Sequence, residues 1–142
     1  MAAEAAECAG EQGKYWYMYD LLFARQTDWS GQQDAAPIFK TYAGELGLDQ
    51  AQFDACLGSS KYSAKIQADQ ADGQSANVSG TPTFIINGAP LVGAQPYSAF
   101  QQQLDYYIAG GRAPTLILAA DSFQSIGQAD APMVITEFSD FQ

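Results

Sequence analysis

Few side chains of this sequence could take part directly in covalent or acid–base chemistry. The 142 residues include no histidine, and the two cysteines, Cys8 and Cys56, stand far apart. The lack of histidine excludes histidine general bases, Ser-His and Cys-His nucleophile pairs, and histidine metal sites. Two distant cysteines cannot form a four-ligand zinc site by themselves. The sequence therefore predicts neither a metal nor another cofactor.

The remaining candidates for chemistry are the two sulfurs, one proline and one acid. A reactive dithiol needs adjacent sulfurs at a helix N-terminus, as in Cys-x-x-Cys, whereas Cys8 and Cys56 both fall inside predicted helices. Pro82 precedes an apolar strand in Ser-Gly-Thr-Pro-Thr-Phe, and Glu137 interrupts another in Met-Val-Ile-Thr-Glu-Phe. Taken alone, a proline at a strand start is commonly an ordinary trans proline.

The composition fits one globular domain and limits the class of partner. The apolar fraction is 47%, and six basic against sixteen acidic residues give a formal net charge of −10. This charge opposes nucleic acid and anionic lipid, and we interpret it as a source of solubility. No run approaches the about 20 apolar residues that span a membrane. The start does not resemble a secretion signal, so we expect the native N-terminus to lie elsewhere.

Helical patterns cover the first half of the chain. The helix over residues 15–24 carries an aromatic stripe, Tyr-Trp-Tyr-Met-Tyr. Packing is the favoured interpretation of this stripe, and a peptide-binding groove is the alternative. Helices are predicted over residues 2–10, 15–24, 34–46, 49–57 and from 59 or 60 to 76, with a polar loop over 27–33.

The pattern changes to that of strands after Val78. Residues 83–86 are predicted to form a strand, with Asn87-Gly88 as a two-residue hairpin turn and a short return strand over 90–93. A helix over 97–109, a linker over 113–131 and a closing strand over 133–138 follow. This order predicts a small three-stranded sheet with one uncovered face, which should be marginal in stability.

Two stretches resemble the DsbA-like branch of the thioredoxin superfamily, but in the reverse of that family's order. Residues 2–111 resemble its later part, through Cys-Ala-Gly-Glu-Gln-Gly-Lys-Tyr-Trp from Cys8 and Val-Ser-Gly-Thr-Pro-Thr-Phe-Ile-Ile-Asn-Gly from Val78. Residues 127–142 resemble its first strand, which in the family leads directly into a Cys-Pro-x-Cys motif. These 142 residues do not contain that motif.

The resemblance implies an α/β, thioredoxin-like (DsbA-like) fold with a helical insertion, incomplete or circularly permuted. Its small mixed sheet should place the C-terminal strand beside the cis-proline hairpin. Residues 1–111 would be the helical insertion plus the C-terminal half of the fold, and 112–131 a linker. Residues 132–142 would be a first core strand that joins its own sheet, a partner chain or a next module. A window from a tandem protein is the favoured history, and a permuted variant is the alternative.

The resemblance also implies roles for individual residues. In the family, the proline at the position of Pro82 follows a cis peptide bond and faces the redox cysteines. Thr81 would then present its backbone and side chain to an extended substrate strand. Glu137 matches a buried acid that relays protons to the cysteines, the alternative being that strand alternation points it to solvent. Phe138, Asp140 and Phe141 match the approach to the active site.

The family context favours a structural disulfide between Cys8 and Cys56, two buried free thiols being the alternative. The implied activity is thiol–disulfide exchange on extended, cysteine-containing polypeptides in the periplasm or another extracytoplasmic compartment. Without the Cys-x-x-Cys pair, this chain should be inactive alone. The alternative function is a non-catalytic module, either a strand-swapped homodimer or a peptide-binding module, and neither nucleic acid nor membrane is an expected partner.

Overall fold

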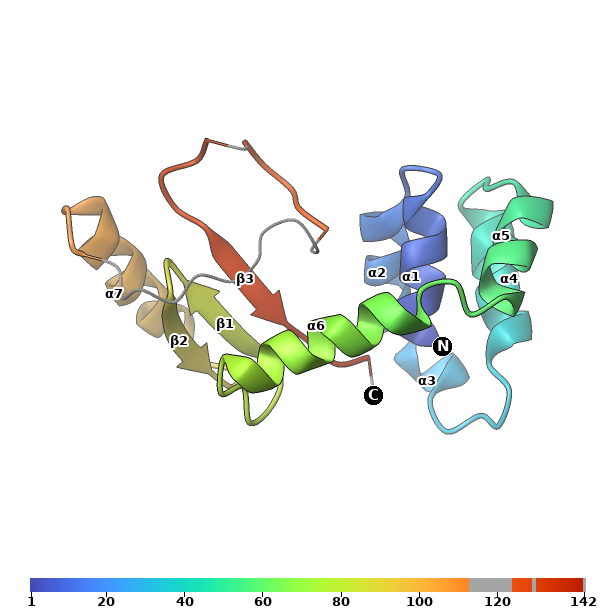
Figure 1. The fold of residues 1–142 in the computed structure, drawn as a ribbon, viewed down its shortest axis with the longest axis horizontal. Helices are drawn as coiled ribbons and strands as arrows, with labels where there is room; N and C mark the ends of the chain where they lie inside the picture. The colour runs from blue at the N-terminus through green and yellow to red at the C-terminus, as the bar shows by residue number, and fades with distance from the viewer. Residues whose placement is uncertain (113–123, 129, 142) are drawn as a thin grey trace. The chain divides into compact units, whose positions relative to one another are not determined.

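The computed structural model describes residues 1–112, 124–128 and 130–141, so most of the predicted linker over 112–131 lies outside the described residues. The elements, in order, are α1 (Ala2–Gly10), α2 (Tyr15–Ala24), α3 (Gln26–Trp29), α4 (Ala36–Glu45), α5 (Gln50–Gly58), α6 (Ser63–Ser75), β1 (Thr83–Ile86), β2 (Ala89–Val92), α7 (Tyr97–Ile108) and β3 (Ile135–Phe138) (Figure 1). No helix in this described part of the chain has the length and apolar character needed to cross a membrane.

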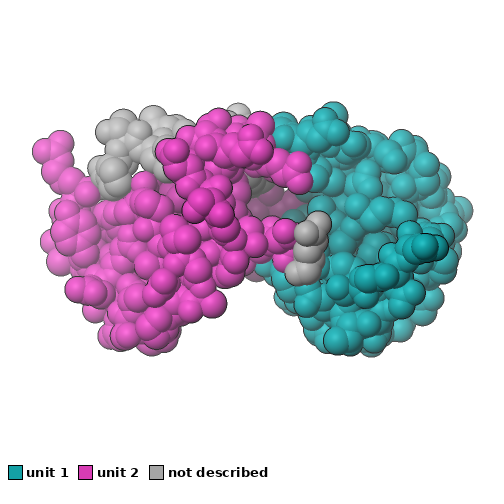
Figure 2. Space-filling model, turned by 90° about the horizontal axis from the view of Figure 1, so that it is seen from below, with its two compact units in different colours: residues 1–68, 141–142 teal, residues 69–140 magenta. Residues whose placement is uncertain are grey.

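The chain divides into two compact units (Figure 2). The helical unit comprises residues 1–68 and 141–142, and the sheet unit comprises residues 69–140. The boundaries predicted at residues 111 and 131 divide the chain by its resemblance to the family, not by its contacts. These boundaries stay a prediction.

The helical unit is built around an alanine-rich helix, α1. Ala5, Ala6 and Ala9 are completely buried, and their small side chains allow neighbouring helices to approach α1 closely. Phe39 of α4 and Phe53 of α5 fill the core beside them and are also almost fully buried. The predicted helices over 2–10 and 15–24 are confirmed with the expected bounds.

A disulfide between Cys8 and Cys56 joins α1 to α5. Both residues are buried, at 2% and 7% exposure, and neither is a free thiol. The predicted pairing is thus present, and the alternative of two free thiols is wrong. The disulfide links two helices of one core, which fits a structural role.

Two ion pairs link the end of α1 to residues around the start of α6. Lys61 Nζ lies 2.6 Å from Glu11 Oε1, and Lys65 Nζ lies 2.9 Å from Glu7 Oε1, whose side chain is only 6% exposed. The hydrogen bond from Lys61 is the main reason that the pKa of Glu11 lies below its usual value. The same contact raises the pKa of Lys61. These lysines therefore neutralise Glu7, which is buried in α1, and Glu11, which follows the end of that helix.

Two local predictions for this unit are wrong. Residues 26–29 form the short helix α3 instead of a loop, because Trp29 is 8% exposed and its indole Nε1 donates a hydrogen bond to the Leu22 carbonyl at 3.0 Å. Helix α6 begins at Ser63, later than predicted. Ser60 has a φ of 51°, a left-handed backbone conformation that cannot continue a helix.

The three strands of the sheet unit lie in the order β2-β1-β3, and β1 is antiparallel to both neighbours. The sheet is therefore antiparallel, and the predicted mixed sheet is wrong. The tight turn at Asn87-Gly88 forces β2 to run against β1. On the other side, Thr83 pairs with Phe138 and Ile86 with Ile135, so the closing strand lies beside the proline-led strand as expected.

Asn87 fixes the start of β3 as well as the hairpin turn. Its backbone φ of 45° suits the turn, and its side-chain Oδ1 accepts a hydrogen bond from the Val134 N–H at 2.7 Å. Its own N–H donates to the Val134 carbonyl at 2.9 Å. One residue thus ties two segments that are distant in sequence.

The two faces of the sheet are covered by different helices, one by the part of α6 that belongs to the sheet unit and the other by α7. Thr83 and Ile85 are buried on one face, where the Phe138 ring lies so close to Gly73 of α6 that a Cβ there would come within 3.2 Å of it. On the opposite face, Phe84 packs edge-on against Phe100 of α7, with ring centroids 4.9 Å apart. Coverage of that second face is incomplete, since Ile135 is 49% exposed.

We expect the disulfide to contribute substantially to the stability of the helical unit. Replacing Cys8 and Cys56 together by alanine should lower the free energy of unfolding by about 4 kcal/mol, because the link shortens the unfolded chain across 48 positions. Urea unfolding followed by helical circular dichroism would measure this. Reductant should lower the wild-type midpoint and leave that of the double variant unchanged. A wild-type midpoint insensitive to reductant would contradict the prediction.

Low pH should destabilise the helical unit, in part because Glu11 becomes protonated. Because its pKa is lowered on folding, chiefly by Lys61, the carboxylate stabilises the folded state above its unfolded pKa. This contribution is lost as the pH falls through the folded pKa. Lys61→Met should therefore reduce the drop in the urea midpoint between about pH 6 and about pH 3. Lys14→Met, at a lysine over the Tyr17 ring, is the matched control. Identical pH profiles for wild type and K61M would refute the assignment.

Candidate functional site

The proline loop, residues 79–83, is the best candidate for a binding site in the sheet unit. The loop is fastened on both sides of Thr81. The Thr83 hydroxyl donates to the Gly80 carbonyl at 2.6 Å, and the Gly93 N–H donates to the Pro82 carbonyl at 2.8 Å. The peptide bond between Thr81 and Pro82 is cis.

Thr81 lies exposed between these two anchoring contacts. Its backbone N–H and C=O have no hydrogen-bond partner among the residues that the structure describes. A donor and an acceptor held in a fixed, exposed backbone can pair with an extended peptide, as in strand addition. The roles in substrate binding that the family resemblance implies for Thr81 and Pro82 stay predictions.

Glu137 is exposed in β3, opposite Phe84 of β1. This position agrees with the alternative in which strand alternation turns the acid to solvent, and burial of the carboxylate is not observed. Glu137 does have a polar or electrostatic interaction in the structure. A role as a proton relay stays a prediction.

The two cysteines do not form a reactive site. Cys8 and Cys56 belong to the helical unit, are buried and are joined to each other. A buried disulfide between two helix interiors lacks the exposed thiolate that exchange requires. Within the described ranges, no group of three or more His, Cys, Asp or Glu side chains could hold a metal ion.

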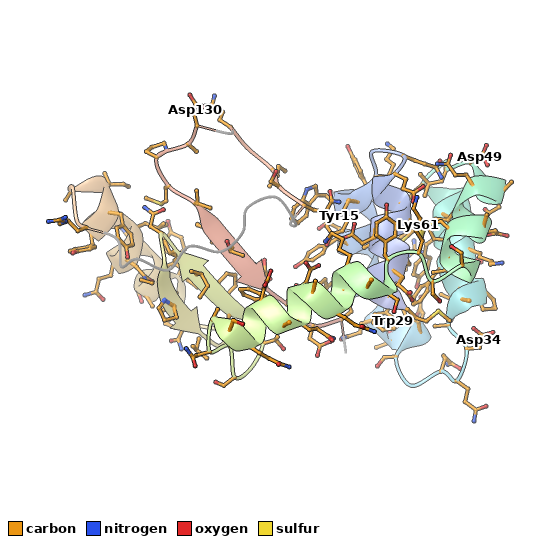
Figure 3. All side chains as sticks on the ribbon, in the orientation of Figure 1. Tyr15, Trp29, Asp34, Asp49, Lys61 and Asp130 are labelled. Carbon is orange, nitrogen blue, oxygen red and sulfur yellow. A yellow bond between two sulfur atoms is a disulfide. The ribbon has the colours of Figure 1, made fainter. Side chains whose placement is uncertain are left out.

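A second candidate site lies on α2 of the helical unit and was not predicted in this form. We define the aromatic face as Tyr15, Trp16, Tyr19 and Phe23 (Tyr15 is labelled in Figure 3). Phe141 packs against this face, and its carbonyl accepts a hydrogen bond from Gln26 Nε2 at 3.0 Å. The sequence showed the aromatic stripe, but it gave no signal for Phe141 as its contact.

A family model described as Thioredoxin matches residues 1–106. This range includes all of the helical unit apart from residues 141–142, and it includes the proline loop with β1, β2 and most of α7. The match therefore covers most of the chain.

Two curated relatives are much longer proteins that are named as antiporters. "Na(+)/H(+) antiporter NhaA 1" of Salinispora arenicola is 38% identical over 112 residues, which are 79% of this chain and 16% of that protein. "Na(+)/H(+) antiporter NhaA 3" of Salinispora tropica is 42% identical over 88 residues, 62% of this chain and 13% of that protein. The chain thus spans about one sixth or less of the length of these relatives. No solved structure matches the chain significantly.

The stability of the proline loop should depend on Gly93, whose N–H donates a hydrogen bond to the Pro82 carbonyl. Gly93 has a φ of +83°, which costs an L-residue about 1 kcal/mol or more, so Gly93→Ala should destabilise the sheet unit by about 1 kcal/mol. Gly80→Ala is the matched control, because φ at Gly80 is not positive and no atom lies within 4 Å of the added Cβ. Thermal unfolding followed by the amide resonances of β1 would compare them. Equal stability of the two variants would be evidence against an anchoring role for Gly93.

Proposed function

The chain belongs to the thioredoxin family, and from this membership we propose that it is a DsbA-like domain that binds polypeptides for thiol–disulfide exchange. In this proposal the proline loop binds the backbone of an extended, cysteine-containing polypeptide. The conformation of Thr81 is the observation that carries the proposal, because its exposed N–H and C=O are held between two fastened neighbours.

The thiol chemistry itself would need a dithiol that these 142 residues do not include. In such exchange, a thiolate attacks one sulfur of a substrate disulfide, forms a mixed disulfide and releases the other sulfur as a thiolate. The second thiol of the pair then resolves the mixed disulfide, so that two electrons pass to the substrate and the pair becomes a disulfide; run in reverse, the same steps oxidise a substrate dithiol and reduce the pair. The residues described here would bind the substrate during these steps, and a Cys-x-x-Cys pair would supply the reacting thiols.

An oxidising compartment is part of the proposal. Disulfides form and persist outside the cytosol and are rare inside it. The buried Cys8–Cys56 link supports a periplasmic or other extracytoplasmic location for the domain.

Ion transport is not part of the proposal for these residues. The relatives are named antiporters as whole proteins, and the chain corresponds to 16% of one and 13% of another. We propose that the similarity reflects a thioredoxin-family domain present in those longer proteins. The order of the family's segments in this chain agrees with a window from such a protein or with a permuted variant.

A peptide titration tests the proposed role of the proline loop. The probe is a short, extended peptide centred on S-methylcysteine, which binds without exchanging a disulfide. Two-dimensional amide spectra of the full chain should show shifts at Thr81 and its neighbours and none at the Asn87-Gly88 turn, at the other end of β1. Thr81→Ala keeps the backbone donor and acceptor, so the dissociation constant should change by less than about threefold.

Two results would remove the proposal. One is a Thr81 amide that is already protected from solvent exchange in the free chain. The other is peptide binding that leaves the Thr81 and Thr83 amide resonances unshifted. As an activity control, the chain should not catalyse insulin reduction. Turnover that persists in a variant with Cys8 and Cys56 both changed to serine would show that another group performs the chemistry.

A further inference from the structure

Helix α2 presents two different faces. Met18 and Leu22 lie on one face and are completely buried in the core of the helical unit. The aromatic face adjoins it, and Tyr15, Trp16 and Tyr19 there are only half-buried. The core contacts of Met18 and Leu22 hold the helix in place, so the aromatic face does not need its own burial to be ordered.

The aromatic side chains form a continuous surface along about two helical turns. The Tyr15 and Tyr19 rings are stacked, with centroids 6.3 Å apart, and Trp16 meets Tyr19 edge-on at 5.4 Å. Phe23 extends the surface, 4.9 Å from Tyr19. Edge-on and tilted contacts of this kind are the favoured geometry of aromatic pairs. The face is therefore an ordered aromatic platform.

Phe141 is a residue of this chain that packs against the platform. Its ring lies 5.4 Å from that of Tyr19 and 4.9 Å from that of Phe23. The Gln26 side-chain amide donates to the Phe141 carbonyl at 3.0 Å, across 115 positions of sequence. Phe141 itself lies in a stretch without helix or strand. One ring and one backbone carbonyl thus make the contact, and any polypeptide with an aromatic residue can supply both.

We propose that the aromatic face, together with Gln26, is a binding site for an aromatic side chain of an extended polypeptide. Phe141 is the resident occupant of this site and competes with polypeptides from outside. The partner is an unfolded or extended segment that exposes a phenylalanine, tyrosine or tryptophan. The inference is independent of the proline loop and of thiol exchange, because all of its residues belong to the helical unit.

Competition makes the proposal quantitative. A tethered group has an effective concentration in the millimolar range, so external peptide should bind the wild-type chain weakly. Removing the Phe141 ring should strengthen binding by about tenfold or more. Each aromatic contact in the site should change affinity by about two- to tenfold.

The experiment uses the full chain and a probe peptide with the sequence Phe-Ser-Asp-Phe-Gln, capped at both ends. Isothermal titration would compare wild type with Phe141→Ala, and a peptide with both phenylalanines replaced by alanine gives the background. We expect F141A to bind the probe about tenfold more tightly than wild type. Adding Tyr19→Ala to F141A should cost about fivefold or more, and adding Gln26→Ala should cost less.

Tyr17 provides a matched control on the same helix. It is 59% exposed, its ring lies under the Lys14 ammonium, and helical spacing places it on the opposite side from Tyr19. Tyr17→Ala in F141A should leave probe affinity unchanged. If Tyr19→Ala unfolds the chain, Tyr19→Leu keeps the apolar volume and removes the ring, and it should also weaken binding.

Several results would overturn the proposal. One is that F141A does not bind the probe at millimolar concentration. Another is that Y17A and Y19A, each added to F141A, reduce the affinity for the probe equally. A third is that the alanine peptide binds F141A as tightly as the probe does. Loss of the helical circular dichroism in F141A would show that Phe141 belongs to the core, which also overturns it. A wild-type dimer that F141A converts to a monomer would identify a second copy of this chain as the occupant, against the proposed external polypeptide.

Discussion

The pairing of β1 on both of its edges is the constraint on which the sheet unit depends. The side chains of Thr83, Ile85 and Ile86 are buried, so the backbone groups between them need partners inside the sheet. Strand β2 pairs with one edge of β1 through a two-residue turn, and β3 pairs with the other edge from far along the chain. The proline loop ends at Thr83, the first residue of β1, so the conformation of the loop is set by a strand that is paired on both sides.

Much of this fold could be predicted because its signals are local. Helical spacing and a closing glycine or turn set the bounds of α1 and α2, and the Asn87-Gly88 pair, with two positive φ angles, set the hairpin. The pairing of β3 with β1 came from resemblance instead, because no local pattern specifies which distant strand fills an open edge. The same resemblance indicated that Cys8 and Cys56 form a disulfide, which their spacing alone does not show.

A wrong loop prediction and a missed contact both have their physical origin in tertiary contacts. The polar residues around Trp29 read as a loop, yet burial of one indole and its hydrogen bond to Leu22 hold a short helix there. Tertiary burial can thus outweigh weak local propensity. Phe141 was expected only as part of the approach to the active site, and its contact with the aromatic face depends on a carbonyl and a ring meeting across the chain.

The two units divide the physical work in a way that bears on function. The two cysteines of the sequence form a buried disulfide in the helical unit. This disulfide links two helices of the core and leaves neither cysteine as a free thiol for exchange. The described residues present other groups instead, and the two binding proposals rest on them: an exposed amide and carbonyl at Thr81, and a half-buried row of aromatic rings on α2. Backbone pairing and aromatic contact both tolerate many sequences. A domain that handles varied unfolded polypeptides needs that kind of recognition, and it can have it without carrying the reactive sulfurs itself.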